Sequence, residues 1–193
     1  PPRLDSSAAS DVYKRQDYGW PGDPASGLQG AGAEVIMLDS YVKFMLAEAA
    51  LTLGTTGDPR QLLLDAVQSS IDYVMAFGEE MAVEDYIPSQ QDIDDYLAEV
   101  GNLYDNAASD TERLEVIAKE YYIALFGNGV ESYNLVKRTT MPSNLQPALL
   151  ADPGNFPRTF NYAADCVNLN SSISQKPHTV QVFWDTNPEG SIN

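Results

Sequence analysis

The sequence predicts a mainly α-helical protein in which helix hairpins stack as an α-solenoid and a long irregular carboxy-terminal segment follows. Three observations predict this fold class. Apolar residues recur at three- and four-residue steps between residues 33 and 138, as they do on one face of a helix. Capping residues and glycines divide that region into segments of ordinary helix length. Beyond Pro142 the composition shifts to Asn, Ser, Pro and Asp, and the helical period disappears.

The first predicted helix runs from about Ala33 to Leu53. It follows a segment, residues 17–32, that is rich in Gly, Pro and Ser and is expected to be an extended loop. Gly54 and Gly57 end the helix, because glycine readily adopts the left-handed conformation of a helix terminus. The expected buried stripe of this helix consists of Val35, Leu38, Val42, Met45, Leu46, Ala49 and Leu53.

A second helix is predicted to begin directly at Asp58 and Pro59. The aspartate can accept a hydrogen bond from a free amide, and proline fits the first helical position. Gly78 marks the expected end of this helix. Its expected buried stripe consists of Leu62, Leu63, Ala66, Val67, Ile71, Val74 and Phe77. Because the turn between them is short, the two helices are expected to form an antiparallel hairpin.

Two capping patterns predict the next helices. Ser89 with Asp92, and Ser109 with Glu112, each place an acidic side chain three residues after a serine, as in a capping box. The expected stripes are Ile93, Leu97, Val100 and Leu103 in one helix and Leu114, Ile117, Ala118, Tyr121 and Leu125 in the other. A shorter helix over residues 130–138 is predicted after the break at residues 127–129.

The remaining expectations concern the two ends of the helical region. Two hairpins are fewer than the roughly three repeats that a solenoid needs for independent stability, so further helices are expected upstream. In the carboxy-terminal segment, residues 179–184 are expected to form a short isolated strand, and the rest to be irregular. Long loops of this kind are typically functional or draped over a scaffold.

The charge and cysteine content of the chain exclude several classes of partner and site. The 193 residues contain 28 Asp and Glu against 11 Lys and Arg, for a formal net charge of -17. Nucleic acid would be repelled, whereas neutral ligands such as sugars are compatible with this charge. Cys166 is the only cysteine, which excludes an intrachain disulfide and a multi-cysteine zinc site. No apolar run is long enough to span a membrane.

Residues 1–16 resemble the translation of a sequencing adapter more than a natural protein segment, and residues 6–16 carry that resemblance. We therefore expect residues 17–193 to be the carboxy-terminal part of a longer single domain. The amino terminus does not have the pattern of a signal peptide, so any export signal is expected upstream of this chain.

Three stretches resemble the SusD/RagB-like family. The first is the alanine-rich stretch of residues 47–50 with the turn at residues 57–59. The second and most specific comprises residues 121–134, the Lys-Arg-Thr at 137–139 and Pro142. The third comprises Phe156-Pro157-Arg158, Tyr162, Asn168, Asn170 and the terminal Val182-Phe183-Trp184-Asp185. Cys166 stands where this family commonly has Glu, and Tyr133 stands where it commonly has Trp.

This resemblance implies a tetratricopeptide-like helical fold and a protein that binds a glycan or similar nutrient without catalysing a reaction. It also implies exposure at the surface of the cell outer membrane, through a lipid anchor on an upstream cysteine that is absent from this chain. A SusC-like TonB-dependent transporter would receive the oligosaccharide. No cofactor, metal site or catalytic residue is expected.

Three aromatic residues in loops, Tyr18, Trp20 and Trp184, are the candidate ligand-binding residues. Aromatic rings stack on the apolar faces of sugar rings, and loops carry binding residues more often than helix stripes do. The alternative is that these rings pin the loops onto the helices. Arg138 and Arg158 are expected to tie loop carbonyls or carboxylates to the scaffold, since a planar guanidinium can hold several acceptors.

Other candidate sites have weaker signatures. Asp92, Asp94 and Asp95 lack the Gly and Glu positions of a calcium loop, so a solvated helix surface is expected there. Adjacent acids at residues 79–80 could form a glycosidase pair, and Cys166 with His178 a nucleophile and base, but neither has a supporting motif. Two alternatives to glycan capture therefore stay open: a tetratricopeptide-type protein interaction scaffold and an α-helical glycoside hydrolase.

Overall fold

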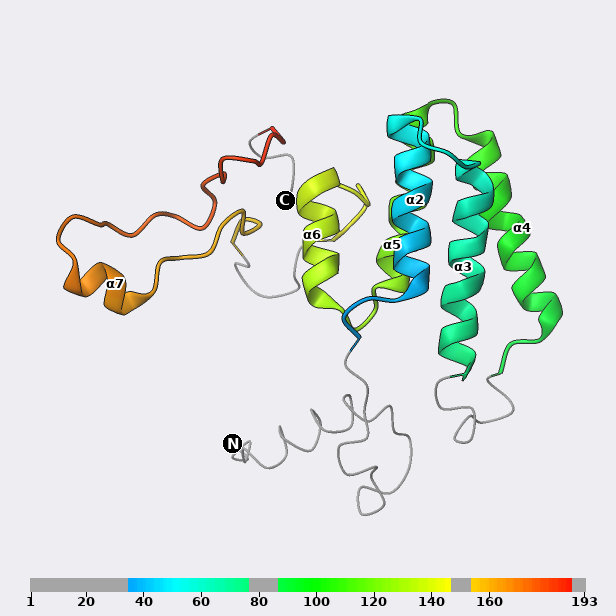
Figure 1. Ribbon diagram of the computed structural model, residues 1–193, viewed down its shortest axis with the longest axis horizontal. Helices are drawn as coiled ribbons and strands as arrows, with labels where there is room; N and C mark the ends of the chain where they lie inside the picture. Colours follow the sequence, from blue (N-terminus) through cyan, green and yellow to red (C-terminus); the bar gives the residue numbers. More distant parts are fainter. Residues whose placement is uncertain (1–34, 77–86, 147–153, 189–193) are drawn as a thin grey trace, which may run out of the picture. The chain divides into compact units, whose positions relative to one another are not determined.

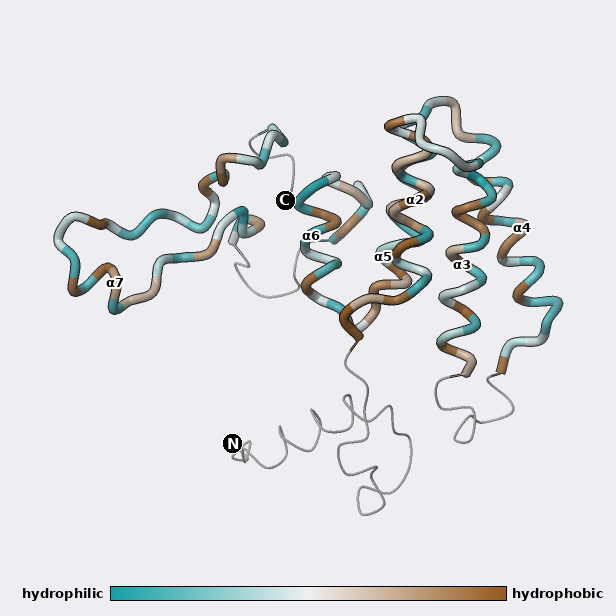
Figure 2. Tube along the Cα trace, in the orientation of Figure 1, coloured by the Kyte–Doolittle hydropathy of each residue, from teal (hydrophilic) through white to brown (hydrophobic). Residues whose placement is uncertain are grey.

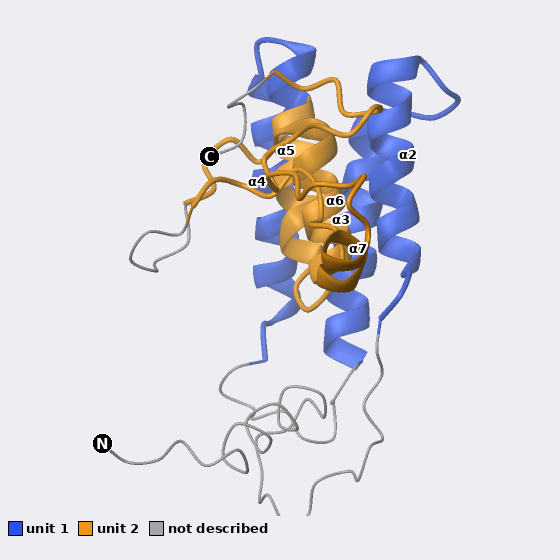
Figure 3. Ribbon diagram, turned by 90° about the vertical axis from the view of Figure 1, so that its left-hand side faces the viewer, with its two compact units in different colours: residues 1–113 blue, residues 114–193 orange. Residues whose placement is uncertain are grey.

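The computed structural model describes residues 35–76, 87–146 and 154–188. The helices are α2 (Asp39–Leu53), α3 (Pro59–Ala76), α4 (Gln90–Asn106), α5 (Asp110–Ala124), α6 (Gly129–Thr139) and α7 (Ala164–Leu169) (Figure 1). No strand occurs among the described residues, so the predicted mainly α-helical fold class is confirmed. None of the described helices is long and apolar enough to cross a membrane. The chain divides into two compact units, residues 1–113 and residues 114–193 (Figure 3).

Helix α2 of the first unit begins at Asp39, later than the predicted start near Ala33. Residues 35–38 are not helical, and Leu38 is extended with φ of -110°. The β-branched Val35 and Ile36 favour extended backbone, while Asp39 suits the first helical turn. The Asp39 carboxylate lies 2.6 Å from the Lys43 ammonium one turn later.

The buried face of α2 is not the predicted one. The buried residues are Ser40, Tyr41, Phe44, Ala47 and Ala50, whereas Val42, Met45, Leu46 and Leu53 of the predicted stripe are exposed. Both faces are apolar, and Figure 2 shows more apolar residues along α2 than along α4. On such a helix periodicity cannot choose a face. Packing selects the face whose aromatic rings bury the most area and whose alanines permit close approach.

Helices α2 and α3 form the predicted antiparallel hairpin, lying side by side in Figure 1. Gly54 ends α2 in the left-handed conformation, with φ of 64°. The Asp58 carboxylate then accepts a hydrogen bond from the Arg60 amide at 3.0 Å, as its capping role requires. Leu63, Ala66 and Val67 of the predicted α3 stripe are buried, whereas Val74 is exposed.

Helix α4 packs against α3 through an arginine and a glycine. The predicted capping box is confirmed, with Ser89 accepting from the Asp92 amide and the Asp92 side chain bonding the Ser89 amide. The Arg60 Nε of α3 lies 2.8 Å from Asp105 Oδ1 of α4. A Cβ at Gly101 would approach Arg60 Nη2 to 2.6 Å, so the absence of a side chain there admits the guanidinium.

The second unit is centred on the carboxy-terminal part of α5 and on α6. The predicted α5 residues Ile117, Ala118, Tyr121 and Leu125 are buried, as are Leu135 and Val136 of α6. The break between these helices contains Gly127, with φ of 89°, and Asn128, whose side chain accepts from the Glu131 amide. Asn128 therefore starts α6 as its N-cap.

The carboxy-terminal segment is largely irregular, as predicted, but two of its details differ. Residues 179–184 form no strand, because the Asp185 amide donates to the Val182 carbonyl in a turn and no described strand pairs with them. A segment with an alternating apolar pattern forms a strand only where a neighbouring strand supplies backbone hydrogen bonds. In addition, the segment contains the unpredicted helix α7, whose six residues are too few for periodicity to reveal.

Candidate ligand-binding surface

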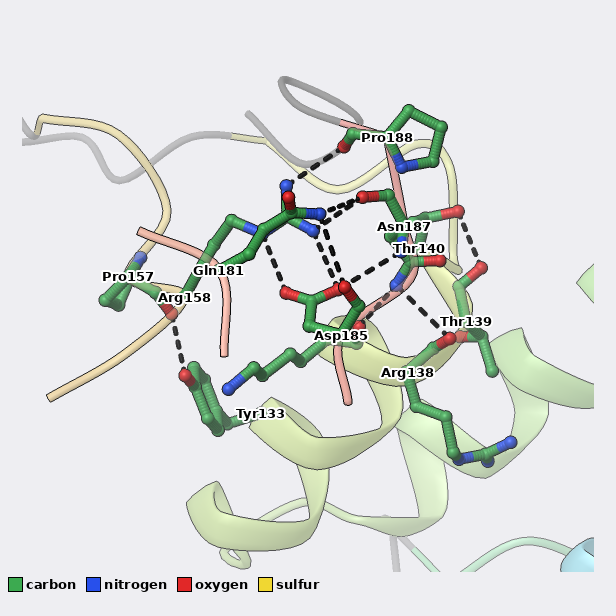
Figure 4. A network of polar contacts seen from close by, with 11 residues as sticks. Tyr133, Arg138, Thr139, Thr140, Pro157, Arg158, Gln181, Asp185, Asn187 and Pro188 are labelled. Atoms are coloured by element: carbon green, nitrogen blue, oxygen red, sulfur yellow. Dashed lines mark hydrogen bonds and ion pairs between the residues drawn. The ribbon is translucent and has the colours of Figure 1, made fainter. Parts of the chain in front are cut away.

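The irregular segment of the second unit is held in place by a buried ion pair. Arg158 Nε lies 2.8 Å from Asp185 Oδ2, and Arg158 Nη2 lies 2.7 Å from Asp185 Oδ1 (Figure 4). Only 6% of the Arg158 side chain and 1% of the Asp185 side chain remain exposed. The guanidinium also donates to the carbonyls of Asn187 and Pro188. One planar donor group therefore joins two parts of the segment that are distant in sequence.

Asn187 connects this ion pair to helix α6. Its backbone amide donates to Asp185 Oδ1 at 3.2 Å, and its side-chain amide donates to the Lys137 and Arg138 carbonyls at 2.6 and 3.3 Å (Figure 4). Carbonyls in the last turn of a helix have no intrahelical donor, so Asn187 also serves to satisfy the end of α6. Gln181 adds a bond to the Asn187 carbonyl.

Trp184, the residue before Asp185, is thereby placed over the side chain of Lys137. The Lys137 ammonium lies 4.4 Å from the centroid of the Trp184 ring and 5.5 Å from that of the Tyr133 ring. Lys137 is 5% exposed, whereas Trp184 retains 54% of its surface. The tryptophan thus covers a lysine of α6 while keeping a large part of its ring in contact with solvent.

Two further aromatic rings continue this surface. Tyr133 stacks on Phe156 with a centroid distance of 5.4 Å and an interplanar angle of 13°, and it lies 6.3 Å from Phe160. Its hydroxyl donates to the Pro157 carbonyl at 2.7 Å (Figure 4). Phe160 is 84% exposed. We refer to Tyr133, Phe156, Phe160 and Trp184 as the aromatic surface.

These contacts shift the pKa values of Asp185 and Tyr133. The hydrogen bonds from Arg158 are the main reason that the pKa of Asp185 lies below its usual value, and burial opposes them. Burial raises the pKa of the Tyr133 hydroxyl, and the nearby Asp185 carboxylate adds to this effect. Asp185 is therefore held ionised and Tyr133 neutral at neutral pH.

Of the three predicted ligand-binding residues, the structure describes only Trp184. Trp184 lies at the aromatic surface, where it both covers a helix side chain and stays accessible; Tyr18 and Trp20 lie outside the described residues. The expectation for Arg158 is confirmed, and the backbone carbonyl of Arg138 accepts a hydrogen bond from Asn187. Lys137, Tyr133, Phe156 and Phe160 were not predicted as site residues. Lys137, Tyr133 and Phe156 lie in the stretches that carry the family resemblance, whereas Phe160 does not and had no signal in the sequence.

The other candidates are also placed in part. Asp92 caps α4, and the Asp94 and Asp95 carboxylates accept bonds from Gln90 and Gln91, so this cluster forms the expected helix surface. Cys166 is exposed on α7, and the His178 carbonyl accepts from the Arg158 and Thr159 amides. The acids at residues 79–80 lie outside the described residues.

Residues 27–177 match the family model described as SusD-like, the Susd and RagB outer membrane lipoproteins. This chain belongs to the SusD-like family. The match covers α2 to α7 and most of the segment that carries the aromatic surface. No curated protein matches the chain.

A solved structure supports the SusD-like fold. The chain resembles a structure titled "Bacteroidetes AC2a SusD-like", with a TM-score of 0.65 and 16% sequence identity. The alignment covers 97% of this chain and 39% of that chain, so this chain spans well under half the length of the relative. At this identity the likeness establishes the fold.

Proposed function

We propose that this chain belongs to a surface protein of the outer membrane that captures an oligosaccharide or similar nutrient. It passes the ligand to a SusC-like TonB-dependent transporter and catalyses no reaction. A lipid anchor upstream of this chain holds the protein at the membrane. The family membership supports this proposal, and the observation that carries it is the aromatic surface, which the buried Arg158–Asp185 pair and Asn187 hold against α6.

The aromatic surface suits this role because two of its rings, Trp184 and Phe160, remain open to solvent. Trp184 and Phe160 present apolar faces on which a sugar ring can stack, and Trp184 is placed by its contact with Lys137 before the ligand arrives. A preorganised surface loses less conformational entropy on binding than a mobile one. Neighbouring backbone and side-chain polar groups can bond sugar hydroxyls.

The test is a glycan array probed with the full-length gene product and two variants. Trp184→Ala removes the exposed ring of the aromatic surface, and Phe126→Ala removes a ring that is 97% exposed after α5, outside that surface. We expect glycan binding by the wild type and by Phe126→Ala, and at least about tenfold weaker binding by Trp184→Ala, in the range of a stacking contact. Reducing-sugar release by the purified protein would contradict the proposal. Co-purification with the transporter tests the partner.

One observation favours the alternative of a protein interaction scaffold. The side chains of Val42, Met45, Leu46 and Leu53 form an exposed apolar stripe along α2. Such a stripe on a helical repeat can receive a peptide or another helix. Peptide pull-down with the wild type and with a Leu46→Gln variant tests this alternative.

We further propose that the chain is the carboxy-terminal part of a longer domain, whose upstream helices cover that stripe, and that residues 1–16 are not native. The exposure of the stripe supports this view, as does the greater length of the solved relative. Extending the gene product upstream is expected to raise its melting temperature and to lower its binding of an apolar dye per molecule. Unchanged dye binding would count against the proposal.

A further inference from the structure

Helix α7 is carried by a loop, residues 158–178, whose two ends are joined; we call it the α7 loop. The Arg158 amide donates to the His178 carbonyl at 2.8 Å. Further along the loop, the Gln175 side chain accepts from the Tyr162 amide and donates to the Tyr162 carbonyl, each at 2.9 Å. Arg158 is 5% exposed and also belongs to the buried ion pair. The base of the α7 loop is therefore fixed within the second unit.

The far end of the α7 loop has no comparable support among the described residues. Helix α7 lies there (Figure 1), and none of its six residues is buried. Its N-cap, Ala163, provides no side-chain hydrogen bond, and Leu169 is 85% exposed. A helix of six residues is not stable in water alone, because most helical stability in proteins comes from the packing of one face. A surface beyond the described residues is therefore needed to cover α7.

The composition of the α7 loop is that of a surface in contact with protein. Residues 159–175 contain one charged side chain, Asp165, whereas α4, which has the same length, contains five. The centres of protein interfaces are depleted of charged residues, whereas surfaces that face water are rich in them. The α7 loop therefore fits a partner that presents an apolar surface with few charges.

We propose that α7 docks on the amino-terminal part of the same longer protein, which covers it permanently. This inference rests on the proposal that the chain is the carboxy-terminal part of a longer domain, and it adds the surface that joins the two parts. The alignment covers 97% of this chain but 39% of the solved relative, so more than half of such a protein is available to cover α7. The cover is permanent because α7 would lose its helical structure without it. The contact is confined to α7 and leaves the aromatic surface open.

Cys166 provides the measurement, because it lies on α7 and its side chain is exposed in this structure. The experiment measures the rate at which a neutral maleimide modifies Cys166 in the native full-length gene product and in the same protein unfolded in urea, by peptide mass spectrometry. We expect modification to be at least about tenfold slower in the native protein, since thiol reactivity requires access. A cysteine introduced by Lys119→Cys, at an exposed position on α5, should react at similar rates in both states.

Variants assign the protection to the docking of α7. Leu169→Asp places a charge in the proposed contact, and we expect it to speed the modification of Cys166 about tenfold and to lower the melting temperature by several degrees. On a free surface the same substitution would have little effect on stability. Lys119→Gln changes the formal charge by the same amount and should change neither quantity. The wild-type comparison tests the proposal even where Leu169→Asp does not fold.

Three results would overturn the proposal. Equal rates of Cys166 modification in the native and unfolded protein would mean that nothing covers α7, and glycan binding by the same preparation would leave the proposed function standing. Protection that disappears on dilution would identify a second copy of the protein as the partner. Protection that arises only when the transporter is added would identify the transporter. Conversely, a protected Cys166 in a protein that binds no glycan would support the docking of α7 and remove the proposed function.

Discussion

At the scale of single residues, the Arg158–Asp185 pair decides whether the aromatic surface exists. Removing one partner leaves the other charge buried without a counter-ion. We expect Arg158→Met to destabilise the docked segment by about 3 kcal/mol, in the range measured for broken buried pairs. The expected readout is a red shift of Trp184 fluorescence and faster amide exchange at residues 181–187. Lys119→Met should change neither quantity.

The same pair predicts a dependence on pH. The pKa of Asp185 is lower in the folded protein than in the unfolded chain, chiefly because Arg158 donates to its carboxylate. Its stabilising contribution is therefore fully present above the unfolded pKa of about 3.9 and is lost as the pH falls through the folded value. We expect Trp184 fluorescence in the wild type to report release of the segment below about pH 4.

An Asp185→Asn variant is the control for that titration, because it removes the titrating group. It should have a less stable segment at neutral pH and a much flatter pH dependence. A wild-type profile that is unchanged by this substitution would mean that other carboxylates control the acid transition.

At the scale of helices, α2 offers a direct test of which face is buried. Phe44 is 1% exposed and Leu46 is 45% exposed, although the predicted stripe contained Leu46 and not Phe44. We expect Phe44→Ala to lower the free energy of unfolding by about 3–5 kcal/mol and Leu46→Ala by less than about 1 kcal/mol. Urea denaturation of the two variants measures both values. Equal losses of unfolding free energy in the two variants would indicate that both faces of α2 are covered in the full-length protein.

The contact between α3 and α4 illustrates how a helix contact can depend on an absent side chain. Arg60 reaches Asp105 by passing Gly101, where a Cβ would meet its guanidinium at 2.6 Å. Alanine is the better helix former by about 1 kcal/mol, so propensity alone predicts that Gly101→Ala stabilises α4. Because the guanidinium must move, we expect little or no net gain in melting temperature. Combined with Arg60→Met, the same substitution should become stabilising.

At the scale of the whole molecule, charge is the dominant feature. At a formal net charge of -17, the acidic side chains repel one another in the folded protein. We expect the melting temperature of the chain to rise as NaCl is added, because salt screens this repulsion. A melting temperature that falls as NaCl is added would contradict this expectation.

The sequence by itself determined much about this protein. Glycines and capping side chains at Gly54, Asp58, Ser89 and Asn128 mark helix ends through contacts within a few residues, and such local signals can be read without the fold. The predicted stripe of α5 was largely right, with Ile117, Ala118, Tyr121 and Leu125 buried, and that of α3 was right in part, with Leu63, Ala66 and Val67 buried. Family membership was evident from the stretches around α6 and the carboxy-terminal segment.

The tertiary structure alone decided the rest. The buried face of α2 depends on partners that lie far away in sequence, and residues 179–184 form no strand because no described strand pairs with them. The aromatic surface has the same origin, since Trp184 meets Lys137 only because Arg158 and Asn187 fix the segment to α6. Such contacts leave no period or local motif, because their energy is gained only when separate parts of the chain come together.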